Sequence, residues 1–306
     1  MRSALRSPVF WVGVVGLLVA AVLPLGVSSY ILGILTVGYY FGVFAMSWDL
    51  LFGFAGEVNF GPTFLVGLGA YGAGILNSET GLPIPVCVLF GTALAVAGGL
   101  LLAVPALRLS GPYFGLTTLV AVLLLQQMVT VFAKQTGGEI GLTIPDVLSI
   151  DETTNYYIAL GVMAVSGAVL FGLSRSAAGL ILQACGQDPV EAQALGFNVA
   201  KHKLAAFCVS AFFSGLAGAM LIFYFGTASP GTVIDIAVGV QVIIAAVLGG
   251  RRTILGAAVG AVVLILAGEV LRPLGQLSTF VVSAVALLTI LFVPSGLLGV
   301  LMRNRQ

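Results

Sequence analysis

The chain has 306 residues, of which 59% are hydrophobic and only 8% are charged. This composition lies far from that of soluble globular domains. The formal net charge of +1 excludes a strongly basic surface for nucleic acid and an acidic tail. We therefore expect an all-α integral membrane protein embedded in a lipid bilayer.

Apolar runs follow one another along the whole chain, and runs of about 17 to 25 residues can cross a bilayer as helices. The first run follows two basic residues, as in a secretory signal, but it has no clear small-residue cleavage site. We interpret it as a membrane span. The ten predicted spans are 9–27, 30–51, 62–76, 83–106, 113–133, 155–174, 203–226, 234–250, 254–271 and 277–299.

Basic residues predict the orientation, because Lys and Arg concentrate in short cytoplasmic loops. With both termini inside, only Lys134 and Arg272 of the 12 basic residues fall outside. The longest cytoplasmic loop is then 175–203, and the large external loop is 134–154. We expect one transmembrane domain over 1–306, with both ends in the cytoplasm.

The stretch "FGFAGEVNFGPTF" (52–64) predicts a broken or re-entrant segment. Its glycines and proline disfavour a continuous helix, and Glu57 and Asn59 are polar in an apolar neighbourhood. Irregular backbone at membrane depth is tolerated when it is buried in protein or lines a wet cavity, and transporters place broken helices beside the solute path. A cytoplasmic turn with a solvated Glu57 is an equally good interpretation. The glycine- and alanine-rich stretch 67–74 predicts a face for close helix packing.

Polar side chains inside the predicted spans are candidates for a solute pathway. A threonine can instead bond its own helix backbone, and a glutamine can bond a neighbouring helix. Glu269 lies close enough to Arg272 for a local ion pair. The predicted pathway residues are Glu57, Asn59, Thr117, Thr118, Gln126 and Gln241.

A small polar helix is predicted within "QDPVEAQALGFNVAKHK" (187–203). Asp188 is a good N-cap, Pro189 suits the first helical position, and Glu191 completes an Asp-x-x-Glu capping box. Gly196 can take the left-handed conformation that ends a helix. A helix over 189–195 is marginal alone in water, so it needs a supporting surface. That surface is either the lipid headgroup region or a cytosolic partner.

The pattern EAxxxG, formed by Glu191, Ala192 and Gly196, resembles the EAA signature of membrane subunits of bacterial ABC importers. Longer stretches, in the same order, resemble the permease family for branched-chain amino acids, which has relatives for urea, short amides and sugars. They are "WDLLFGFAGEVNFGPTFLVGLGAYGAGIL" (48–76), "LRLSGPYFGLTTL" (107–119), "EAQALGFNVAKHKLAAFCVSAFFSGLAGAM" (191–220), "VLGGRRTILGAAVGA" (247–261) and "LFVPSGLLGVL" (291–301).

This resemblance implies a coupling helix that contacts an ATPase through Asp188, Glu191, Ala192, Leu195 and Gly196. It also implies a multi-pass protein of a prokaryotic inner (plasma) membrane. The implied partners are two ATPase subunits that bind ATP, a second permease chain in a heterodimer, and an external solute-binding protein. The implied cargo is branched-chain or other hydrophobic amino acids, with urea, short amides or a sugar as alternatives.

The chain departs from the family pattern at three places. The arginine that usually precedes the EAA element is missing from 184–188, so Lys201 and Lys203 are candidates for the positive contact to the ATPase. Asn59-Phe60-Gly61-Pro62 stands where the family has Ser-Leu-Gly-His/Gln, and 251–253 reads Arg-Arg-Thr after the double glycine, where a Gly-Thr pair is usual.

Motif absences favour a transport subunit over an enzyme, with no cofactor or metal of its own. The sequence has no G-x-x-x-x-G-K-[ST] loop, and a single histidine, His202, cannot form a nucleophile–base set. The three cysteines have neither disulfide-framework nor metal-site spacing. An ion-coupled secondary transporter is the rival class, and it predicts an essential carboxylate deep in a helix. The carboxylates Asp49, Glu57, Asp235 and Glu269 instead map near the ends of predicted spans.

Overall fold

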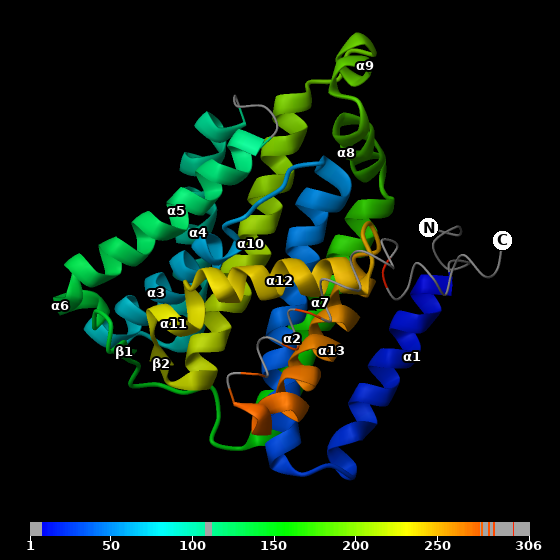
Figure 1. Ribbon diagram of the computed structural model, residues 1–306. Helices are drawn as coiled ribbons and strands as arrows, with labels where there is room; N and C mark the ends of the chain where they lie inside the picture. Colours follow the sequence, from blue (N-terminus) through cyan, green and yellow to red (C-terminus); the bar gives the residue numbers. More distant parts are fainter. Residues whose placement is uncertain are drawn as a thin grey trace. The chain divides into compact units, whose positions relative to one another are not determined.

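The computed structural model describes residues 8–107 and 112–275, together with the single residues 277, 281, 284 and 296 (Figure 1). Apart from these single residues, the predicted tenth span and the motif at 291–301 lie outside the described part. So do five of the basic residues used to predict the orientation: Arg2, Arg6, Arg108, Arg303 and Arg305.

Each of the first nine predicted spans corresponds to a helix, and six described helices are long and apolar enough to cross a membrane. An all-α membrane protein is therefore confirmed, while the count of ten spans and their orientation stay predictions. The helices at these spans are α1 (Pro8–Val22), α2 (Ser29–Asp49), α3 (Pro62–Thr80), α4 (Ile84–Ala106), α5 (Pro112–Val131), α7 (Glu152–Arg175), α10 (Val199–Phe225), α12 (Ile236–Gly249) and α13 (Leu255–Leu271).

Shorter elements join these helices. A π-helical turn, η2 (Leu50–Ala55), continues α2, and the 3-10 turns η1 (Leu23–Leu25) and η3 (Arg272–Leu274) follow α1 and α13. The remaining elements are α6 (Ala133–Thr136), α8 (Ala177–Gln187), α9 (Pro189–Ala194), α11 (Pro230–Val233) and the antiparallel pair β1 (Leu142–Thr143) and β2 (Thr227–Ala228).

The described residues group into two compact units, while the single domain over 1–306 stays a prediction. The first unit comprises Met1–Asp49, Asp151–Ser176 and Val242–Gln306. In it, α2 packs against α7 and α13. The rings of Tyr39 and Tyr156 meet edge to face with centroids 5.2 Å apart, so α2 and α7 share a buried aromatic contact.

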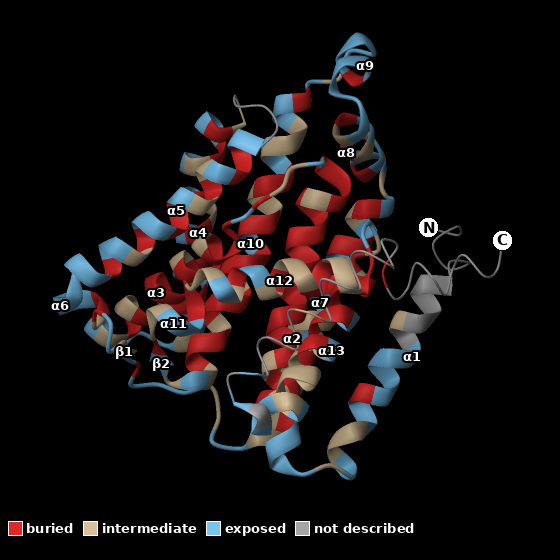
Figure 2. Ribbon diagram, viewed as in Figure 1, coloured by how far each residue is buried: buried red, intermediate tan, exposed pale blue. Residues whose placement is uncertain are grey.

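The second unit comprises Leu50–Ile150 and Ala177–Gln241, and its core is formed by α3, α4 and α10. Gly69 lies so close to the backbone of α10 that a Cβ would overlap the carbonyl group of Gly215. The backbone of Gly69 in turn leaves no room for a Cβ at Gly91 of α4. The predicted small-residue face is therefore confirmed, because it brings the backbones of three helices close together. Figure 2 colours the buried residues of these helices red.

The predicted loops contain more structure than the sequence indicated. The stretch 175–203 holds α8 in addition to the expected small helix, and α10 begins at Val199, four residues before the predicted span. The buried residues of α8 are Gly179, Leu182 and Cys185, so this helix forms by packing and not by cap signals. The helix α7 begins inside the predicted external loop 134–154. Asp151 is its N-cap, and the Asp151 carboxylate accepts the Thr154 N–H at 2.9 Å.

Candidate functional site

The helix predicted over 189–195 is present as α9 (Pro189–Ala194), at the far end of α8 in Figure 1. The Asp188 carboxylate accepts the N–H groups of Val190 at 2.9 Å and Glu191 at 3.0 Å, as expected for an N-cap. Gly196 has φ +89°, the left-handed conformation predicted for the helix end. The helix stops one residue earlier than predicted, with Leu195 as its C-cap.

The predicted capping box is only half formed. Its second half required the Glu191 side chain to accept the N–H of Asp188. That N–H donates instead to the carbonyl oxygen of Ala184 at 3.1 Å, because α8 runs up to Gln187 and supplies the acceptor. The Glu191 side chain is therefore left exposed on the surface of α9.

One side of α9 is supported by its own chain. Ala192 is 1% exposed and forms a buried cluster with Cys185 of α8 and Val199 of α10, against which Ile181 and Phe197 pack. Ala192 was predicted to contact an ATPase, but it lies inside this cluster and supports α9 from within. The short helix therefore gains the support that it needs in water.

The rest of α9 is open, as its mostly exposed ribbon in Figure 2 shows. Val190 and Leu195 are 76% and 75% exposed, next to the exposed Asp188, Glu191 and Gly196. Two large apolar side chains beside carboxylates, on a capped and supported helix, make a compact surface that suits a protein partner.

The predicted broken segment is the non-helical stretch from Gly56 to Gly61, between η2 and α3. Gly56 has φ +72°, and a Cβ on it would lie 2.6 Å from the carbonyl oxygen of Gly186 in α8. The loop backbone therefore rests directly on the backbone of α8.

Buried side chains hold the rest of this stretch. Asn59 is 1% exposed, and its side-chain oxygen accepts the Gly61 N–H at 2.8 Å. The Phe60 N–H donates to the hydroxyl of Thr118 on α5 at 3.0 Å. Backbone N–H groups in a non-helical segment lack the acceptors that a helix provides and need other partners. These two side chains supply them and so stabilise the irregular segment.

An ion pair that sequence reasoning missed ties the broken segment to α10. Lys203 Nζ lies 2.5 Å from Glu57 Oε1, and the two side chains are only 14% and 16% exposed. Glu57 was predicted to line a pathway or to be solvated at a turn, and Lys203 to contact a partner. The predicted topology placed both residues at cytoplasmic ends of spans. Two opposite charges on the same side of the membrane were the signal from which the ion pair could have been predicted.

The other predicted pathway residues are not gathered with these. Thr117 bonds its own helix, with its hydroxyl donating to the Tyr113 carbonyl at 2.9 Å. The side-chain amide of Gln126 lies 3.4 Å from the carbonyl oxygen of Ile234. Gln241 is partly buried on α12. The structure thus brings together Asn59 and Thr118 and pairs Glu57 with Lys203.

A buried carboxylate whose structural role the sequence did not predict lies in the first unit. Asp49 is 1% exposed and accepts the N–H groups of Arg252 and Ile254, each at 3.0 Å. Both loop residues have positive φ, +65° and +47°, which is unusual for residues with a Cβ. Asp49 therefore fixes the turn at 250–254, where the chain departs from the family pattern.

The described helices and this site define a multi-pass membrane protein with an exposed, capped loop helix. Residues 30–294 match the family described as branched-chain amino acid transport system / permease component. The chain belongs to this family and is a permease component of the ABC type. No solved structure matches the chain.

Three characterised relatives carry the same description of function. The chain is 28% identical to the high-affinity branched-chain amino acid transport system permease protein LivM of Escherichia coli K12, over 97% of this chain and 76% of that protein. It is 27% identical to LivM of Salmonella typhimurium, over 92% and 73%. It is 25% identical to the permease protein BraD of Pseudomonas aeruginosa, over 87% and 93%.

Proposed function

We propose that this chain is the membrane-spanning permease subunit of a prokaryotic inner-membrane ABC importer for branched-chain or other hydrophobic amino acids. Two ATPase subunits, a second permease chain and an external solute-binding protein complete the importer. The observation that carries the proposal is α9, which is capped by Asp188, supported through Ala192 and exposed at Val190 and Leu195. Family membership and the names of the relatives support the class of cargo.

In this mechanism, α9 docks on an ATPase subunit, and closure of the ATPases around ATP displaces it. The cluster of Cys185, Ala192 and Val199 makes α8, α9 and the start of α10 move together. The Gly56–Gly186 contact and the Glu57–Lys203 ion pair then carry the displacement to the broken segment. The importer changes state because ATP-bound and nucleotide-free ATPases favour different positions of α9.

The broken segment is the proposed moving part of the solute path. In the present conformation Asn59 and Thr118 bond the loop backbone, so their polar groups are used internally. The Thr118 hydroxyl donates to the Gly115 carbonyl, so a shift of the segment frees its oxygen as an acceptor, together with the Phe60 N–H, for a solute. Irregular backbone beside a transport path performs this role in other membrane transporters.

The docking proposal is tested with one change on α9 and a matched change elsewhere. Leu195→Asp places a charge in the proposed interface, whereas Ile150→Asp alters another exposed apolar residue, 95% exposed, in the stretch predicted to be external. In proteoliposomes with both permease chains, the ATPases and the binding protein, we expect Leu195→Asp to lower leucine uptake at least tenfold and Ile150→Asp to leave it near wild type. Equal uptake in the two variants would contradict docking through α9.

The same proteoliposomes test the cargo and the energy source. We expect isoleucine and valine to compete with labelled leucine, and urea, acetamide and free sugars not to compete. Uptake driven by an ion gradient in vesicles without the ATPase subunits would overturn the proposal in favour of a secondary transporter.

A further inference from the structure

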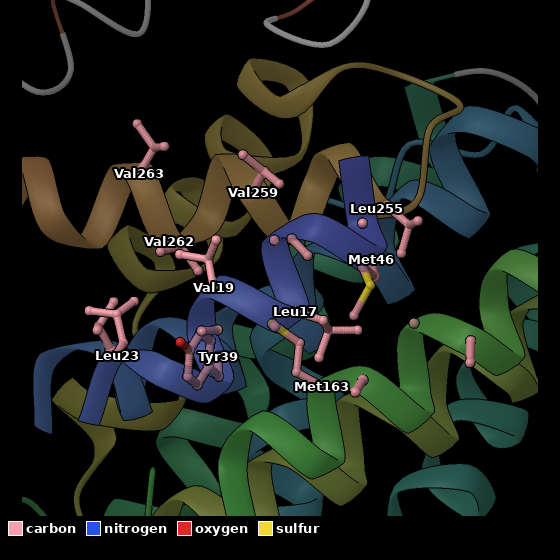
Figure 3. A pocket seen from close by; sticks show the side chains of 18 of the residues that line it. Leu17, Val19, Leu23, Tyr39, Met46, Met163, Leu255, Val259, Val262 and Val263 are labelled. Atoms are coloured by element: carbon pink, nitrogen blue, oxygen red, sulfur yellow. The ribbon is translucent and has the colours of Figure 1, made fainter. Parts of the chain in front are cut away.

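An elongated cavity of about 380 Å³ lies among α1, α2, α7 and α13, within the first unit (Figure 3). Its lining extends from Gly13 to Leu23 along α1 and η1, and from Leu35 to Met46 along α2. At about 1.5 Å per residue, each of these stretches is about 15 Å long. The hydrocarbon core of a bilayer is about 30 Å thick, so the cavity has the length of one leaflet.

The chemistry of the lining excludes water and the transported solute. The lining residues are apolar except for Tyr39, and none is charged. The Tyr39 hydroxyl lies 2.7 Å from the Tyr156 hydroxyl, which donates to the Ala20 carbonyl, also at 2.7 Å. A buried water needs two to four polar partners, and a zwitterionic amino acid loses its hydration without compensation in such a site.

The cavity opens onto apolar surface. Val19 of α1 and Val263 of α13 line it, yet they are 57% and 41% exposed. Figure 3 shows their side chains with those of α2 and α7 around the cavity. In a membrane protein such a surface faces acyl chains, so the mouth of the cavity is continuous with the lipid phase.

One end of α1 is held by hydrogen bonds. Pro24 has no N–H to bond the Ala20 carbonyl, and the Tyr156 hydroxyl takes that place. The Tyr157 hydroxyl donates to the Ala21 carbonyl at 3.0 Å. Near Gly13, Leu255 of α13 lies against α1, and between these two contacts the cavity separates the helix from its neighbours. An empty space there would forfeit dispersion contacts with its walls.

We propose that this cavity binds one hydrocarbon chain of a membrane lipid, which enters from the bilayer between α1 and α13 and completes the packing of α1. The thioethers of Met46 and Met163 lie in the wall, and such flexible side chains adapt to chains of different length and unsaturation. The site recognises the acyl chain and not a particular headgroup, since its lining offers no charged group.

Gly16→Phe fills the cavity, because a Cβ at Gly16 meets nothing within 4 Å. Gly161→Phe is the matched control, since Gly161 is also helical, has equally open space and lies outside the lining. Ala164→Leu fills the cavity from α7 and serves if Gly16→Phe does not fold. Each protein is purified in detergent, its retained phospholipid is counted by native mass spectrometry, and its thermal midpoint is measured with and without added phosphatidylcholine or phosphatidylglycerol.

We expect wild type and Gly161→Phe to retain one more phospholipid per chain than the filled variants, and to gain several degrees on addition of either lipid. A ligand that binds only the folded state raises its stability in this way. The filled variants should show a smaller gain. Equal lipid counts and equal gains in filled and control proteins would overturn the proposal. The proposal would also be overturned if the filled variants kept the lipid but no longer co-purified with the second permease chain, because that chain would then be the occupant of the cavity.

Discussion

Single charged side chains hold irregular backbone in each unit. Asp49 accepts two N–H groups from the positive-φ turn at Arg252 and Ile254, and a hydrogen bond to a charged group contributes about 1.5–3 kcal/mol. A residue held in a sparsely populated backbone conformation costs about 1–3 kcal/mol, so the two bonds offset the strain. At the broken segment, the Glu57–Lys203 ion pair instead joins two side chains and ties the segment to α10.

The ion pair between Glu57 and Lys203 is testable by charge reversal. Lys203→Glu places two carboxylates together in a largely buried position, which should cost about 1–3 kcal/mol and lower the thermal midpoint. Glu57→Lys should do the same, and the double reversal should restore most of the stability because the pair re-forms. Lys201→Glu, the same charge change at an exposed position, should have little effect on the thermal midpoint.

The measurement is thermal unfolding in detergent, followed by uptake in proteoliposomes. If the double reversal is no better than the sum of the two single changes, Glu57 and Lys203 are not coupled, and the proposed link between α10 and the broken segment is lost.

At the level of elements, α9 shows how a six-residue helix persists at the surface. Its start depends on the Asp188 cap and its support on Ala192, while its end depends on Gly196 at φ +89°. An N-cap contributes about 0.5–2 kcal/mol to the stability of a helix. The end of α9 depends on glycine, because glycine takes a positive φ without a steric penalty. The proposed docking surface is thus fixed in shape before a partner binds, which would lower the entropy cost of association.

Gly196→Ala tests this dependence against a matched glycine. Neither Gly196 nor Gly172 of α7 has an atom within 4 Å of an added Cβ, and only Gly196 has positive φ. Gly196→Ala should therefore destabilise the end of α9 by about 1–2 kcal/mol. Hydrogen exchange of the α9 amides should accelerate roughly tenfold. Gly172→Ala should leave α9 unchanged, because it only replaces glycine by a better helix former. Unchanged protection of α9 in Gly196→Ala would show that packing alone ends the helix.

At the scale of the whole molecule, the sequence predicts what depends on local chemistry. The apolar runs predict the helix positions, and Asp188 and Gly196 predict the ends of α9 because caps act within a few residues. Contacts between distant residues could not be predicted in this way. Glu57 and Lys203 are 146 positions apart, and Asp49 and Arg252 are 203 positions apart, so their meeting depends on how the helices pack. α8 was missed for the same reason, since packing determines it.

The orientation of the chain is the last prediction, and it tests the charge argument directly. A topology of ten spans with both ends of the chain inside places α9 in the cytoplasm and Ile150 outside. In a background where the three cysteines are replaced by alanine, Ile150→Cys and Leu195→Cys give single thiols at sites that are 95% and 75% exposed. A membrane-impermeant maleimide should label Ile150→Cys in intact spheroplasts, and Leu195→Cys only after lysis. The reverse pattern would place α9 on the side away from ATP, where no ATPase could reach it, and would contradict both the topology and the proposed coupling.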